Sequence, residues 1–425
     1  MGIETIENKS GFMTILGSCL PAIVPDDLDS LLHDEVLIDR RNKTPMEMDG
    51  YSYYLACKAL EKAYQVDLGS EKKRIVDACV KRCKVCDGFW SHGAWTGSPK
   101  EIHMRFTSTA IRLLVEGYKD GLISDSGIVI KSMRKHLEFS EPIDSGIWFF
   151  HDSLELPSIG IEYPFKNIKN QVWGSSPTNM LVLNTHIDTL VTILFVLRSI
   201  KIHPDDKKFL VEKLAKGVDA LKAVLKLNPS FAWKVFSLID SQVRYFLFNT
   251  VANDVVFFKV IRKIIYKFYF PVRHLFRSKV PGFVFEDGYI ERDISLGGKG
   301  YEYHFVNVWD LAKFIKEAGK SEHIQDKEFI DYCMNLVGNG INYAVSNPYW
   351  KYVLETTKKQ GGAMEICESI IIMQQIEKSG EDDEHWKEAY DKICSLIPPS
   401  PALMGYDPLI LDDTLQQSSS QRLSV

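Results

Sequence analysis

Four loops concentrate the residue types that bind or transform small polar molecules. They are rich in Trp, Tyr, His, Gly and amide side chains, and each leads directly into an apolar helical pattern. Polar and aromatic residues on loops held by a rigid scaffold are typical of binding and catalytic sites. We therefore expect a functional site where the loops 87–105, 140–179, 281–305 and 347–362 meet.

Four histidines lie at loop-to-helix junctions in four different segments, namely His92, His151, His186 and His304. Imidazole titrates near neutral pH, so a histidine can act as a general acid or base. For any one of them, a structural histidine whose ring nitrogens are satisfied inside the fold is the more common case. The sequence predicts candidates for proton transfer and leaves this alternative open for each of them.

Carboxylates and amides near the same junctions extend this set. Asn184 and Asp188 are four residues apart and share a helix face, whereas His186 points about 200° away from them. Apolar residues occupy much of the remaining circumference, so we expect Asn184 and Asp188, rather than His186, to face a cavity. Asp152 and Glu155 are three apart, a spacing open to a hydrolytic carboxylate pair but also common at solvated helix ends.

The elements that must position these residues are helices. Apolar residues recur at three- and four-residue spacing, while the strand-like stretches 147–150 and 283–289 are short and isolated. This pattern excludes a doubly wound sheet and predicts an all-α fold. The predicted helices are 50–66, 71–85, 106–122, 128–139, 180–200, 205–227, 231–248, 306–318, 329–345, 363–376 and 383–396.

Helical hairpins with long loops at one rim suggest a ring of hairpins. The stretches Ser175–His186 and Tyr301–Asn307, each at the head of a predicted inner helix, resemble the (α/α) toroid enzymes of carbohydrate metabolism, in particular the toroid domain of D-glucuronyl C5-epimerase. The resemblance covers residues 45–397 as an architecture. Residues 1–44 are expected to form an N-terminal cap, and 398–425 a flexible tail rich in Pro, Ser and Gln.

This resemblance implies an enzyme that inverts a uronic-acid carbon by removing and returning a proton. It implies Tyr301 or Tyr303, with Glu302 or Glu155, as the proton-transfer groups, and His304 lies beside them; Arg105 is the expected clamp for the substrate carboxylate. A toroid glycoside hydrolase and a non-catalytic glycan-binding protein are the alternatives. The expected substrate-binding residues are His92, Trp95, Arg105, His151, Asp152, Asn179, Asn184, Asp188 and Asn307.

Composition limits the partners. The 425 residues carry a net charge of −5 and a pI near 6.2, which argues against nucleic-acid binding. Scattered cysteines and the lack of a leader-like N-terminus suggest a reducing, cytoplasmic setting. Cys79, Cys83 and Cys86 match an iron–sulfur spacing, but they also form one stripe on a helix, so we expect neither a metal nor another cofactor.

The segment 257–279 stands apart because it holds seven Lys and Arg residues and no acid. As a helix it would place lysines on one face and apolar residues on others. It could lie on an anionic membrane surface, steer an anionic or lipid-linked glycan, or be an ordinary outer helix with a solvated basic face. The segment makes peripheral membrane association one interpretation of this chain.

Overall fold

The protein is described by a computed structural model in which helices make up most of the described residues. An all-α fold is therefore confirmed. The predicted N-terminal cap, apart from two short strands, and the predicted C-terminal tail lie outside the described residues. These residues are 32–33, 36–37, 47–93, 96, 98, 100–156, 171–225, 230–250, 253–294, 301, 303–346, 361–377 and 383–396.

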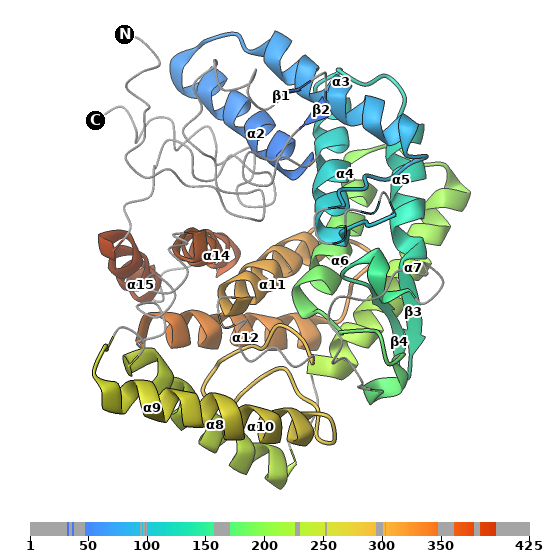
Figure 1. The fold of residues 1–425 in the computed structure, drawn as a ribbon. Coiled ribbons are helices and arrows are strands. Elements are labelled where there is room, and N and C mark those ends of the chain that lie inside the picture. The colour runs from blue at the N-terminus through green and yellow to red at the C-terminus, as the bar shows by residue number, and fades with distance from the viewer. Residues whose placement is uncertain are drawn as a thin grey trace.

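Helices pair into consecutive hairpins, as the sequence predicts. The hairpins are α2 (Glu47–Tyr64) with α3 (Gly69–Val85), α4 (Met104–Lys119) with α5 (Gly127–Glu138), α6 (Leu183–Ser199) with α7 (Pro204–Leu225), α11 (Tyr303–Gly319) with α12 (Lys327–Ser346), and α14 (Gly361–Glu377) with α15 (Asp383–Leu396). The first helices of successive hairpins pack on one another in the order α2, α4, α6, α11, α14 (Figure 1). They form an inner row, and their partners form an outer row.

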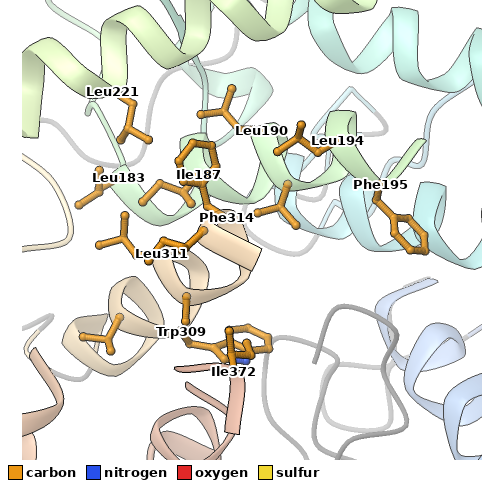
Figure 2. Packing of buried hydrophobic residues seen from close by; sticks show 14 of the residues in the cluster. Leu183, Ile187, Leu190, Leu194, Phe195, Leu221, Trp309, Leu311, Phe314 and Ile372 are labelled. Carbon is orange, nitrogen blue, oxygen red and sulfur yellow. The ribbon is translucent and has the colours of Figure 1, made fainter. Parts of the chain in front are cut away.

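Burial follows from this two-row arrangement. In α4, α6 and α11 nearly every residue is buried, because these helices have neighbours on all sides. The outer helices α3, α7 and α12 bury one stripe, as their amphipathic sequences require. Figure 2 shows side chains of α6 and α11 pointing toward one another, among them Ile187, Leu311 and Phe314.

A second group of helices separates the third and fourth hairpins. It comprises α8 (Phe231–Thr250), α9 (Val256–Ile264), the π-helical turn η5 (Ile265–Tyr269) and α10 (Phe270–Arg277). The last three run on as one helix antiparallel to α8, with Phe236 stacked on Phe276 and Phe246 near Phe258. Among the described residues, no helix combines the length and the apolar character that a membrane span requires.

Short strands and turns complete the architecture. The strands are β1 (Leu32–His33), β2 (Val36–Leu37), β3 (Ser140–Ile143) and β4 (Gly146–Phe149), and the 3₁₀ turns are η2 (Ser153–Glu155) and η4 (Val172–Gly174). β1 pairs with β2, and β3 with β4, each antiparallel. The predicted stretch 147–150 corresponds to β4, shifted by one residue, whereas the predicted stretch 283–289 amounts to a single bridge between Val284 and Ile290.

The same set of histidine hydrogen bonds, which we call the histidine joint, connects the inner and outer helices of two hairpins. In one, His186 of α6 accepts a hydrogen bond from the backbone N–H of Phe149 and contacts the carbonyl of Gly217 on α7 through Nε2 at 2.9 Å. In the next, His304 of α11 accepts from the N–H of Ile290 and contacts the carbonyl of Gly340 on α12 at 3.0 Å. Each imidazole locks an inner helix to an outer helix and to the strand segment before it.

Backbone hydrogen bonds near the two histidine joints also repeat at equivalent positions. The amide of Met104, which begins α4, donates to the carbonyl of His151, and Leu183, which begins α6, donates to Arg292. An aromatic ring covers each joint, because Trp148 stacks on His186 and Tyr289 stacks on His304. Successive hairpins therefore place residues 151–153 and 292–294 at equivalent positions, beside the N-termini of inner helices.

Candidate functional site

Six polar side chains from three chain segments meet at the N-terminal ends of the inner helices. His92 and Glu101 lie on paired backbone, since the amide of His92 donates to the carbonyl of Glu101. His103 precedes α4, and its backbone pairs with that of Asp152 in an isolated antiparallel β-bridge. His151 and Arg292 come from the two equivalent joint segments. We name His92, Glu101, His103, His151, Asp152 and Arg292 the rim cluster.

The imidazoles of the rim cluster are fixed by packing. The rings of His103 and His151 meet edge to face with centroids 4.3 Å apart, and His103 stacks on Phe106 at 4.1 Å. Nδ1 of His151 lies 2.6 Å from the hydroxyl of Thr185, and its Nε2 lies 3.1 Å from Arg292. Because a guanidinium can only donate, Nε2 of His151 accepts, and its proton resides on Nδ1.

Burial sets the protonation states of the cluster. It lowers the pKa of His103 and of His151 well below the usual range, and the neighbouring cationic groups lower both further. Burial also raises the pKa of Asp152 to about 7. Near neutral pH the imidazoles are therefore neutral bases, while a carboxylic acid beside them holds its proton part of the time. This combination suits proton transfer in both directions.

Three members of the cluster have the donor types that bind divalent cations. His92, Glu101 and Asp152 each offer one ligand atom, and these atoms lie within 4.8 Å of one another. Oε2 of Glu101 already accepts from the backbone amide and the hydroxyl of Thr96. Oδ2 of Asp152 is buried without a hydrogen-bond partner in the part of the chain that the structure describes. The group could hold a cation if its ligands moved closer together.

A buried charged network connects the inner helices α4, α6 and α11 beside the rim cluster. Arg105 of α4 contacts Asp310 of α11 at 2.5 Å and the carbonyl of Asn184 at 2.9 Å. Lys313 contacts the same carboxylate at 2.9 Å. Burial acts to lower the pKa of Arg105, but Asp310 raises it overall. The guanidinium that the sequence suggests as a substrate clamp therefore pairs with a carboxylate inside the protein.

Asp188 belongs to the same network. It accepts a hydrogen bond from Arg112 at 2.8 Å, and Arg112 also donates to Thr192. Burial alone would raise the pKa of Asp188, but Arg112 and then Arg105 and Lys313 hold it far below its usual range. Asp188 therefore carries its negative charge near neutral pH.

Asn184 is the least satisfied side chain of this region. Both its amide nitrogen and its amide oxygen are buried, and neither has a hydrogen-bond partner among the described residues. Oδ2 of Asp188 is in the same state. An unpaired buried polar group costs about 1–3 kcal/mol, so such groups indicate a ligand or water that would complete them. Asp188 contacts Arg112 of α4 and His186 contacts Gly217 of α7, so these two side chains point to different neighbours, as their spacing predicts.

Several predicted site residues make structural contacts instead. Glu155 accepts hydrogen bonds from the backbone amides of His151, Asp152 and Met180, and burial raises its pKa to about 8. Asn179 donates to Glu141 and accepts from the amide of Leu181. Both residues shape the loops that carry the rim cluster.

Among the predicted site residues around α11, some make contacts within the fold and one lies beside the rim cluster. Tyr301 is buried against Phe248 and Tyr289, and burial raises its pKa well above the usual range. Asn307 donates to backbone carbonyls of the strand segment 290–291. Tyr303 differs, since it is only partly buried and its ring lies 4.2 Å from the guanidinium of Arg292.

The structure thus brings together four of the predicted site residues, namely Tyr303, His92, His151 and Asp152. Five others make contacts within the fold, namely Tyr301, His304, Glu155, Asn179 and Asn307. Glu302 and Trp95 lie outside the described residues. The cysteine stripe also belongs to the framework. Cys79 and Cys83 are buried in α3, and burial raises the pKa of both thiols.

Sequence reasoning did not place Glu101, His103 or Arg292 in the site. Asp310 and Lys313 were also missed, although they lie three residues apart within a predominantly apolar helical pattern. Opposite charges at this spacing share a helix face, and a buried charge requires a partner, so this signal could have identified them.

Comparisons with family models, curated proteins and solved structures find no match for this chain. The geometry of the rim cluster and of the network beneath it therefore carries the argument about function.

Proposed function

We propose that the protein is an (α/α) toroid enzyme that acts on an anionic glycan, with uronic-acid C5 epimerisation as its reaction. The order of packing α2, α4, α6, α11, α14 supports the toroid, because each inner helix contacts the inner helix of the next hairpin. The repeated joint at His186 and His304 supports it further. Repeated contacts of this kind stack similar hairpins side by side, as the wall of a toroid requires.

The observation that carries the reaction is the pairing of an acid and a base in the rim cluster. Asp152 has a pKa of about 7, and beside it His103 stays unprotonated because burial lowers its pKa. Nδ1 of His103 and Oδ2 of Asp152 are both buried without a hydrogen-bond partner among the described residues. Each group is therefore available to exchange a proton with a bound molecule.

Epimerisation assigns a role to each group. A base removes the proton from the sugar carbon that bears the carboxylate, and the electron pair moves into that carboxylate as an enolate. An acid then returns a proton to the opposite face of the same carbon. We assign proton removal and return to His103 and Asp152, whose protonation states match the two roles.

Arg292 replaces Arg105 as the proposed clamp for the substrate carboxylate. Its side chain is 22% exposed and lies 3.4 Å from the carboxylate of Asp293, whereas that of Arg105 is 4% exposed and lies 2.5 Å from the carboxylate of Asp310. A guanidinium binds a carboxylate through two parallel hydrogen bonds and stabilises the enolate that forms on it. His151 holds Arg292 in place through Nε2.

A second reaction, retaining glycoside hydrolysis, is favoured by one separate observation. Carboxylate oxygens of Glu101 and Asp152 lie within 4.8 Å of each other, close to the separation of about 5 Å in retaining enzymes. In that reaction Asp152 would protonate the leaving oxygen and Glu101 would attack the sugar carbon.

Proton NMR of polysaccharides in deuterated water distinguishes the two reactions. Heparosan-type and alginate-type uronic-acid polymers, and neutral glucans as controls, are incubated with the purified protein. Epimerisation predicts loss of the H5 resonance of the uronic acid as deuterium enters, with no new reducing ends. New reducing-end signals with H5 intact would establish hydrolysis instead, and an unchanged spectrum for every polymer would contradict the enzymatic proposal.

A further inference from the structure

Exposed apolar side chains gather on one part of the molecule. Among the described residues, and apart from Val85, every large hydrophobic side chain that is exposed lies between Phe231 and Leu275. Examples are Leu238 and Ile239 on α8 and Phe257 and Phe268 on the continuous helix α9–η5–α10. We call the exposed apolar side chains of these helices the apolar face. The helices that carry it, α8, α9 and α10, lie along the lower edge of the view in Figure 1, away from α2 and α3.

The exposure is extensive for side chains of this kind. Phe231 is 83% exposed, Val256 is 74% exposed, and Phe257, Val272 and Leu275 are each 63% exposed. Monomeric proteins rarely expose contiguous apolar patches of this sort unless another molecule covers them. We therefore expect another molecule to cover the apolar face.

The opposite side of the same helices is firmly anchored. Arg273 of α10 forms ion pairs with Asp240 of α8 and with Glu291, and it is buried. Arg277 is also buried and donates to the carbonyl of Asp293. These buried charges fix which side of α10 faces inward. The apolar side chains on its other side are therefore exposed.

Exposed lysines border the apolar face. Lys263 and Lys267 on α9–η5 and Lys279 just after α10 are exposed, as is Lys234 on α8. From Val255 to Lys279 the sequence contains no acidic residue. An apolar stripe bordered by lysines has the composition of a helix that lies in the interface of an anionic bilayer.

We infer that the apolar face binds the surface of a membrane that contains anionic lipid. Its Phe, Val, Ile and Leu side chains enter the boundary between headgroups and acyl chains, and the lysines contact lipid phosphates and carboxylates. A second copy of the chain is disfavoured as the occupant, because a symmetric contact would bring the two sets of lysines together.

Membrane binding does not depend on the proposed reaction, but the two can be connected. Arg277 contacts the backbone of Asp293, the residue after Arg292, so the membrane-binding helices adjoin one segment of the rim cluster. On the proposed function, this arrangement favours a glycan attached to a lipid as the substrate. Vesicle binding would stand even if no reaction on a glycan were found.

Co-sedimentation of the full-length protein with vesicles tests the inference. One set of vesicles contains phosphatidylcholine alone, and the other contains about one-third phosphatidylserine. We expect binding to the second set and at least about tenfold weaker binding to the first, because several lysines act together. Phe257→Ser/Phe268→Ser and Lys263→Glu/Lys267→Glu should each lower binding to the anionic vesicles by about tenfold or more.

Matched controls change the same residue types elsewhere. Val85→Ser removes the exposed apolar side chain outside the face, and Lys84→Glu/Lys208→Glu makes the same charge change on α3 and α7. Both should leave vesicle binding unchanged. Equal losses in the controls, or no binding to either vesicle, would overturn the inference. Sedimentation velocity without vesicles adds one further outcome: a dimer that Phe257→Ser/Phe268→Ser converts to monomer would assign the face to a second copy.

Discussion

The histidine joint between α11 and α12 leads to a prediction about stability and pH. Nδ1 of His304 accepts from the amide of Ile290, so this nitrogen cannot carry a proton without breaking the bond. Burial lowers the pKa of His304 to about 4 from its usual value near 6.5. The unfolded chain therefore binds a proton in a pH range where the folded protein does not, and acid favours unfolding there.

The size of the effect follows from these two pKa values. Going from pH 7 to pH 5, protonation of His304 in the unfolded chain alone lowers the free energy of unfolding by about 2 kcal/mol. His304→Gln removes this titration and leaves at least one buried backbone group poorly paired, which costs about 1–3 kcal/mol at pH 7. The variant should be less stable at pH 7, and the difference from the unaltered protein should shrink by about 2 kcal/mol by pH 5.

Urea denaturation followed by circular dichroism at several pH values measures this difference. His203→Gln is the matched control, because the side chain of His203 is 71% exposed on the surface. The free energy of unfolding of His203→Gln should change with pH in the same way as that of the unaltered protein. A difference for His304→Gln that stays constant from pH 7 to pH 5, or grows, would refute the role of the imidazole as a buried neutral acceptor.

Two further predictions concern the inner helices. Asp310→Asn leaves Arg105 and Lys313 without their shared carboxylate and should lower the free energy of unfolding by about 3–5 kcal/mol in urea denaturation; a loss under about 1 kcal/mol would contradict a buried network. Gly340→Ala would place a methyl group 2.5 Å from a side chain of α11 and should cost about 1–3 kcal/mol. Gly319→Ala has open space and should raise stability by up to about 1 kcal/mol, so equal effects of the two changes would refute the close packing of α11 on α12.

The order of helices could be predicted from the sequence because apolar spacing encodes burial directly. Each predicted helix corresponds to a helix of the structure, with ends that differ by a few residues. The different directions of Asp188 and His186 followed from the angle between their helix positions, which tertiary contacts do not change.

The roles of individual polar residues could not be predicted in this way. His304 and His151 both follow aromatic loops, yet one bonds two backbone groups and the other holds Arg292. The difference depends on which distant segment lies beside each ring. Arg105 appeared available as a clamp because its partner Asp310 lies 205 residues away in the chain. Pairing over such distances is set by the packing of the inner row and leaves no local signal.

The interpretation of 257–279 is sharpened by the structure. The sequence indicated a basic helix with apolar residues on other faces, but not which of those residues are exposed. Burial of Arg273 and Arg277 turns part of the positive charge inward and leaves the apolar side chains outside. The exposed segment is thus more apolar than its composition suggests.

The central claim is that Asp152 transfers a proton to or from the carbon of a sugar acid. The most direct test compares deuterium incorporation at C5 of the turned-over uronic-acid polymer by the unaltered protein, by Asp152→Asn, and by Asp331→Asn on the exposed side of α12. Asparagine can keep the cap contact to the amide of Leu154, so the fold should survive, as circular dichroism would check. We predict that Asp152→Asn lowers the incorporation rate by at least about a hundredfold, while Asp331→Asn matches the unaltered protein. Equal incorporation by all three proteins would contradict the proposed role of Asp152.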